Sequence, residues 1–167
     1  MCLKLPGIPL AHALAQIGKV CDREVSLEIF NAKPELVDTS VDILYTAYSE
    51  MMKLEAEANT SDPNDIRNAE SMVINLFMLT LDMCSEVGLV YTLIYRLKLH
   101  AFVIDQITSD TPPPARIMKY LVDVLQNMCI ICPEEVCDFI DYSLVMRTGA
   151  LNGARLLATV NPPLNNQ

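Results

Sequence analysis

The chain has 167 residues and a mass of 18.6 kDa, which is the length of one ordinary domain. Its 51% hydrophobic and 20% charged residues exclude a disordered chain and predict a well-buried core, or a surface that a partner covers. Twelve basic against 21 acidic residues give a net charge of -9, which disfavours binding to the phosphates of nucleic acids and to anionic lipid.

Residues 1–9 are predicted to form an N-terminal arm. Its apolar run is broken by Pro6, Gly7 and Pro9, so no secretory leader is predicted. Six cysteines without a leader favour free thiols in a reducing compartment, and hence an intracellular location in the cytoplasm or nucleus. The longest apolar runs, 72–81 and 87–104, contain polar or charged residues, so no transmembrane segment is predicted.

Helical signals dominate residues 10–160, for which we predict an all-α, compact single-domain bundle of about six to seven helices. Only five glycines, with one Asn-Gly pair at residues 152–153 and no Asp-Gly pair, leave few tight turns for a sheet. Prolines fall at the expected boundaries. The predicted helices cover residues 10–30, 34–58, 62–85, 89–107 and 115–131, a sixth begins at residue 133, and a short seventh covers 151–159. Residues 161–167 are predicted to be a flexible tail, or a linker to a following domain.

The third and fourth predicted helices are expected to form a buried central pair. In the third, Asp62 can cap the helix and Pro63 suits its first position. Gly88 suits a helix stop before the fourth. Both helices are apolar on several faces, which is typical of helices at the centre of a bundle.

The stretch NMCIICPEEVC, residues 127–137, places three cysteines around a proline. A structural zinc site needs four ligands, and the chain offers only one Cys-x-x-Cys pair here and no nearby histidine. Helical spacing instead assigns Cys132 to a core stripe, and Pro133 starts the next helix. We interpret the stretch as a helix junction with unreactive thiols. The stripe contains Ile117, Leu121, Val124, Met128 and Cys132.

No cofactor, metal site or catalytic function is predicted. The carboxylates 35, 38 and 42, and 134, 138 and 141, recur at helical spacing and are interpreted as solvated faces. Phosphate-binding loops, nucleophile elbows and zinc-protease motifs are missing from the sequence. His12 and His100 are candidate pH-sensitive residues, and the charges of Arg96 and Lys98 would lower the pKa of His100.

Four basic residues of the second half are a candidate interaction surface. Residues 1–86 carry 14 acids and 6 bases, whereas residues 87–167 carry 7 acids and 6 bases. A local basic patch is therefore compatible with the second half only. Its candidates are Arg96, Lys98, Arg116 and Lys119, which could meet the acidic face of a neighbouring copy.

Four short pieces resemble the N-terminal helical domain of orthomyxovirus matrix proteins. They are DPND at 62–65, GLVY at 88–91, the Cys129 and Cys132 pair followed by Glu, and ATVNPPLN at 158–165. The resemblance implies a multi-helix, non-enzymatic domain that polymerises side by side into a layer within a virion. The basic patch that such proteins use against lipid or ribonucleoprotein has no match here. Peripheral membrane contact would therefore not depend on strong basic charge.

Two functions of different classes follow. The first is a self-associating structural protein that forms a layer or shell, as a viral matrix protein does. The alternative is a helical adaptor that binds a partner peptide or helix in a groove lined with Met and Leu, for which nine methionines are suited. Neither function requires nucleic acid as a partner.

Overall fold

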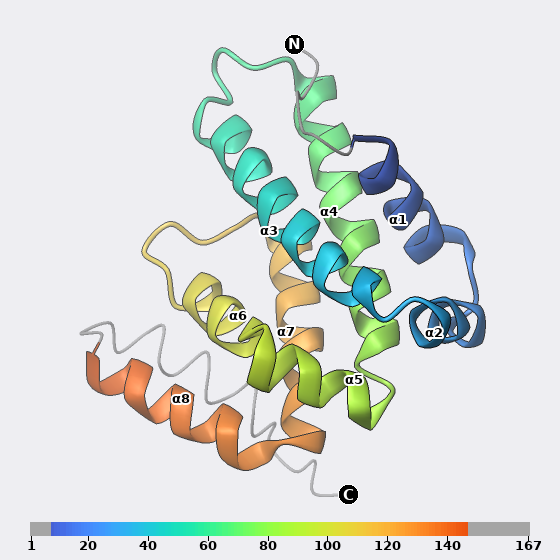
Figure 1. The fold of residues 1–167 in the computed structure, drawn as a ribbon. Coiled ribbons are helices and arrows are strands. Elements are labelled where there is room, and N and C mark those ends of the chain that lie inside the picture. Colours follow the sequence, from blue (N-terminus) through green and yellow to red (C-terminus); the bar gives the residue numbers. More distant parts are fainter. Residues whose placement is uncertain (1–7, 147–167) are drawn as a thin grey trace, which may run out of the picture. The chain divides into compact units, whose positions relative to one another are not determined.

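A computed structural model describes residues 8–146 of the chain. These residues form eight α-helices and one π-helical turn, with no strand among them, which confirms the all-α prediction. The fold divides between Met83 and Cys84 into two compact units (Figure 1), and each is described by itself. The predicted helix at 151–159, the tail at 161–167 and most of the N-terminal arm lie outside the described residues.

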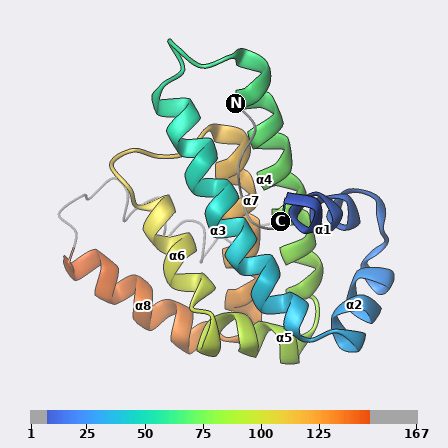
Figure 2. The ribbon, with the colours of Figure 1, turned by 45° about the horizontal axis from the view of Figure 1, so that its top comes forward.

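The first unit contains four helices, of which the last is central. This helix, α4, packs against the other three, and Figures 1 and 2 both show it between α1 and α3. Its apolar residues are all buried or half-buried, as expected for an element covered on several sides. The bounds are α1 (Ile8–Val20), α2 (Arg23–Ala32), α3 (Glu35–Ala56) and α4 (Pro63–Met83).

Small residues allow α1 to approach α4 closely. Ala11, Leu14, Ala15 and Gly18 recur at helical spacing and are all buried. A Cβ atom at Gly18 would lie only 2.1 Å from the backbone oxygen of Asn75 on α4. Gly18 is therefore required by the packing of the two helices.

The core of the first unit is filled mainly by α3 and α4. From α3, Leu44, Tyr48 and Met51 are buried, and from α4 Phe77 is fully buried. The rings of Tyr48 and Phe77 pack edge to face, with centroids 6.5 Å apart and an interplanar angle of 88°. This arrangement is favourable for aromatic pairs beyond the burial of their area.

The structure confirms one predicted helix start in this unit and contradicts the prediction of one continuous helix. The Asp62 carboxylate accepts a hydrogen bond from the backbone N–H of Asn64 at 2.8 Å, and Pro63 opens α4, as predicted. The prediction of one helix over 10–30 is wrong, because α1 ends at Val20 and α2 begins at Arg23. Asp22 between them has extended backbone. Asp22 is the N-cap residue of α2, a position that aspartate prefers to a helix interior, although its side chain makes no capping hydrogen bond.

The second unit contains the remaining helices. Of these, α6 packs against both α7 and α8. The predicted boundaries at 115–131 and at Pro133 are confirmed by α7 and α8. The bounds are α5 (Val87–Tyr91), the π-helical turn η1 (Thr92–Arg96), α6 (Leu99–Ile107), α7 (Ala115–Ile131) and α8 (Pro133–Met146).

The predicted continuous helix over 89–107 is wrong. Its first part widens into η1, where the backbone N–H of Leu97 donates to the carbonyl of Thr92, five residues back, at 3.0 Å. Lys98 then adopts the left-handed region, with φ 55° and ψ 32°, and α6 starts in a new direction. Gly88 is also not a helix stop: it lies inside α5, and its N–H donates to the Glu86 carboxylate at 3.2 Å.

Within the described part of the chain, no single helix is both long and apolar enough to cross a membrane. The two segments 63–83 and 87–96 meet that test only when they are joined, and they are separate helices. The two strongly apolar segments of the sequence, now α4 and α5 to α6, belong to different units.

Candidate interaction surface

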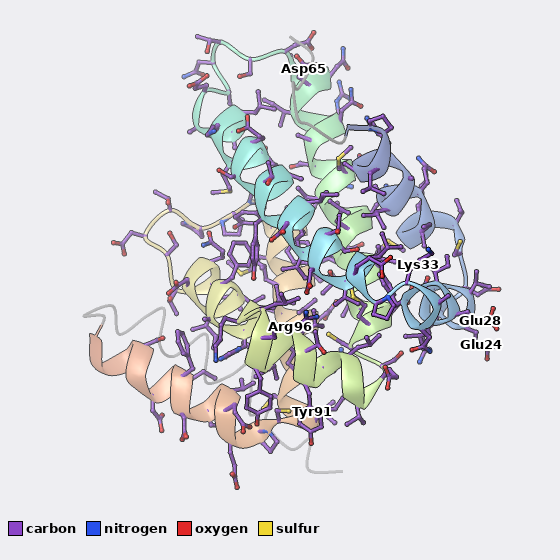
Figure 3. All side chains as sticks on the ribbon, viewed as in Figure 1. Glu24, Glu28, Lys33, Asp65, Tyr91 and Arg96 are labelled. Carbon is purple, nitrogen blue, oxygen red and sulfur yellow. The ribbon has the colours of Figure 1, made fainter. Side chains whose placement is uncertain are left out.

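An exposed apolar stripe runs along α5 and η1. Val87, Tyr91 and Tyr95 recur at intervals of four residues and are 46–51% exposed. The rings of Tyr91 and Tyr95 lie 5.8 Å apart between centroids, tilted by 31°. We call these three residues the α5–η1 stripe; Tyr91 is labelled in Figure 3.

The opposite face of the same segment explains why the stripe points outward. Val90, Leu93 and Ile94 are 0–1% exposed and anchor α5 and η1 to the core of the second unit. The sequence over 87–95 is apolar on all sides, so only one side can be buried against a single layer of neighbours. Val87, Tyr91 and Tyr95 form the side of this segment that stays exposed.

The stripe is connected to the junction of α7 and α8. The Tyr95 hydroxyl donates a hydrogen bond to the Glu135 carboxylate in the first turn of α8. Ile130, near the end of α7, is 79% exposed and is the most exposed large apolar side chain among the described residues. A tyrosine held at its hydroxyl end while its ring remains accessible is well suited to a contact surface, since tyrosine combines an apolar body with a polar tip.

The stripe was not predicted, because the whole segment 89–107 was expected to form one buried helix. A signal was nevertheless present. At positions 91 and 95 the sequence has tyrosine, whereas the buried positions 90, 93 and 94 are aliphatic. Tyrosine is enriched at interfaces and aliphatic residues in cores, so this difference separates the two faces.

The four predicted basic residues are all exposed, but they lie on two elements. Arg96 ends η1 and Lys98 precedes α6, whereas Arg116 and Lys119 occupy the first turns of α7. The Lys119 ammonium lies 5.8 Å from the centroid of the Tyr120 ring. Arg96, labelled in Figure 3, shares the α5–η1 segment with Tyr91, so only the first pair directly adjoins the stripe.

The two histidines differ in environment. His12 is exposed on α1, whereas His100 is 6% exposed on α6 and packs edge to face on Phe139, with ring centroids 5.4 Å apart. Within residues 8–146, Nδ1 of His100 has no hydrogen-bond partner. Burial, and secondarily the charge of Lys98, lower the pKa of His100. His100 is therefore a neutral core residue at neutral pH.

The cysteine junction has the predicted local structure. Cys132 is 3% exposed, its backbone is non-helical before Pro133, and its N–H donates to the Met128 carbonyl at 2.9 Å. Burial raises the pKa of the Cys132 thiol. Among the described residues, no group of three or more His, Cys, Asp or Glu side chains could hold a metal ion.

The remaining predicted features are the two groups of carboxylates and the methionines. Glu35 and Asp42 are exposed and Asp38 is half-buried. The carboxylates at 134, 138 and 141 are exposed, as a solvated face requires. Met51, Met83 and Met128 are fully buried, so these three fill the cores and cannot line an adaptor groove.

No family model, curated protein or solved structure matches the chain.

Proposed function

We propose that the chain is a non-enzymatic structural protein that self-associates, and that the α5–η1 stripe is a contact surface. The observation that supports this function is the line of three exposed apolar side chains along α5 and η1, two of which are tyrosines whose rings lie close together. An exposed cluster of this kind is typical of a surface that another protein covers. The resemblance to orthomyxovirus matrix proteins suggests the assembly, a layer or shell within a virion.

A second copy of the chain is the occupant that the charges favour. Glu86 stands directly before the stripe, and Arg96 and Lys98 stand directly after it. When two such segments pair antiparallel about a two-fold axis, the acidic end of each meets the basic end of the other. The segment 86–98, which contains the stripe, is therefore complementary to itself in charge as well as in apolar character.

The contact is expected to be weak when taken alone. A stable interface buries about 800 Å² on each partner, and three side chains supply only part of that area. In a layer each copy makes several contacts at once, and linked weak contacts give strong assembly. The net charge of -9 adds repulsion between copies, which salt screens, so assembly should increase with ionic strength.

Sedimentation velocity over a range of protein and salt concentrations tests the proposal. The wild-type chain should rise in mean mass above 18.6 kDa as concentration increases. The double variant Val87→Ser/Tyr91→Ser should stay monomeric. The matched control, Val20→Ser/Val25→Ser, removes two exposed apolar side chains from the first unit and should assemble like wild type.

Three outcomes would reject the proposal: a wild-type chain that stays monomeric at all concentrations, equal assembly of the two double variants, or recovery of one stoichiometric foreign protein without self-assembly. The last outcome would favour the adaptor. Liposome flotation in parallel separates assembly in solution from assembly that needs a membrane surface.

A further inference from the structure

The backbone between η1 and α6 is strained at Lys98, although the surrounding sequence favours a helix. With φ 55°, Lys98 is the only non-glycine residue with a positive φ among residues 8–146. Left-handed backbone is unfavourable for a residue that carries a side chain. Residues 89–107 contain no glycine, proline or asparagine that would favour a turn there. The local sequence and the local backbone therefore disagree at this position.

A change at this one residue would join η1 to α6. Leu97 already has right-handed helical backbone. The hydrogen bonding of α6 begins at the Lys98 carbonyl, which accepts a hydrogen bond from the Ala101 N–H at 3.1 Å. With Lys98 in the right-handed region, residues 87–107 would form one helix, and a π-helical turn can remain inside such a helix.

Within a single chain the straight form would take apart a core. In the second unit α5 packs against α7, η1 packs against α6, and the Tyr95 hydroxyl donates to the Glu135 carboxylate of α8. Straightening moves α5 and η1 away from these neighbours, which helps to uncover Val90, Leu93 and Ile94, now 0–1% exposed. Exposure of three buried aliphatic side chains costs more than relief of one strained residue gains. The straight form therefore needs the same neighbours from a second copy.

We propose that two copies of the chain exchange α6, α7 and α8, with Lys98 as the hinge. In the exchanged dimer, α5 and η1 of each copy pack against α6, α7 and α8 of the other, so the contacts across the hinge form again between chains. Two left-handed lysines are relieved at the same time. Short connections under strain favour exchange of this kind.

The exchange rests on the proposed self-association for its role, but it uses a different face of the segment. It depends on the buried face of α5 and η1, whereas the contact proposed above depends on the exposed side chains of Val87 and Tyr91. Exchange requires the second unit to open, so it is slow in the folded chain, and an exchanged dimer must open again before it dissociates. Contacts through the stripe form and break without opening. The rate of dissociation therefore separates the two modes of association.

Refolding of two isotopic forms together tests the exchange. Unlabelled and isotopically labelled wild-type chains are mixed in urea with dithiothreitol, refolded together at high protein concentration, diluted, and examined by native mass spectrometry. We expect dimers of one labelled and one unlabelled chain that persist for hours after dilution. The same two forms, folded separately and mixed in the cold, should give no persistent mixed dimer.

Substitutions at the hinge should change the amount of persistent dimer. Lys98→Ala keeps the strain of the left-handed backbone and favours the straight helix, whereas Lys98→Gly removes the strain from the closed chain. Both variants lose the same charge, so they are matched. We expect several-fold more persistent dimer from Lys98→Ala than from Lys98→Gly, with circular dichroism to verify that each is folded. Val87→Ser/Tyr91→Ser should form as much as wild type.

The exchange is overturned if no persistent dimer forms, or if Lys98→Ala and Lys98→Gly form equal amounts of it. Loss of the persistent dimer in Val87→Ser/Tyr91→Ser would also overturn it, because the stripe would then hold that dimer together. Rapid, reversible association of the wild type without persistent dimers would contradict the exchange and leave the proposed function standing. Persistent dimers in a chain that shows no reversible association would support the exchange and contradict the role of the stripe.

Discussion

The two units of the molecule are built from helices of different regularity. In the first unit, α3 and α4 run without a break for 22 and 21 residues. In the second, the segment from Val87 to Ile107 contains a five-residue helix, a π-helical turn and a left-handed lysine. Breaks of this kind cost free energy locally, and π-helical turns are frequent at functional sites.

The two units also differ in their charge and in the arrangement of their exposed apolar side chains. The first unit has 13 acidic and 6 basic residues, whereas the second has 8 and 6. Figure 3 labels charged residues of the first unit, among them Glu24, Glu28 and Asp65, which are all exposed. Exposed large apolar groups occur in both units, but in the second three of them form one line. We infer that the first unit serves mainly as a solvated scaffold and that the second makes contacts.

The largest expected effect is on the core of the first unit. Phe77→Ala removes a fully buried ring that packs on Tyr48, and it should lower the free energy of unfolding by about 3–5 kcal/mol. Tyr91→Ala, at an exposed ring of the second unit, should change it by about 0.5 kcal/mol or less. Urea denaturation followed by circular dichroism measures both. Equal losses would mean that Tyr91 belongs to a core.

Two glycine-to-alanine substitutions, one in each unit, compare how closely the backbone is packed at the two positions. Gly18→Ala places a Cβ atom against the Asn75 backbone, and it should destabilise the fold by about 1–3 kcal/mol. At Gly88 the added atom would meet only the end of the flexible Glu86 side chain, at 3.1 Å, so Gly88→Ala should be nearly neutral. Thermal unfolding of the two variants measures both changes in stability. Tolerance of alanine at 18 would contradict the close packing of α1 on α4.

The left-handed lysine provides a substitution that should stabilise the second unit. Because φ at Lys98 is 55°, Lys98→Gly relieves backbone strain and should raise the free energy of unfolding by about 1 kcal/mol. The control Lys119→Gly changes the same residue type inside α7 and should lower it by about 1 kcal/mol. The account of the break before α6 fails if both variants are destabilised equally.

The smallest expected effect depends on pH. The pKa of His100 is lowered in the folded state, so the unfolded chain binds the proton more readily. The stability from this group is complete above the ordinary histidine pKa of about 6.5 and decreases as the pH falls below it. His100→Gln should therefore weaken the acid dependence of urea denaturation. An unchanged acid dependence in His100→Gln would exclude the assignment.

The sequence predicted features that depend on local chemistry. Pro133 and the apolar period ending at Cys132 located the junction of α7 and α8, and Asp62 with Pro63 located the start of α4. It did not predict the break before α6, because a lysine has no intrinsic preference for the left-handed region. The two residues that follow it, Leu99 and His100, are both buried at the start of α6.

The candidate site was predicted less well than the fold. Arg96 and Lys98 were identified from charge, but the apolar line beside them was assigned to the interior. Periodicity indicates that a segment is apolar on several faces, and it does not indicate how many neighbours the fold supplies to cover them.

Hydrogen–deuterium exchange at low and high protein concentration tests most directly whether the second unit makes the contacts. We predict that exchange slows at high concentration in Val87–Tyr91 and Thr92–Arg96, while α1 and α2 exchange at the same rate at both concentrations. The double variant Val87→Ser/Tyr91→Ser should show no dependence on concentration. Slower exchange confined to α1 and α2, or no change in any helix of the wild-type chain, would contradict the account.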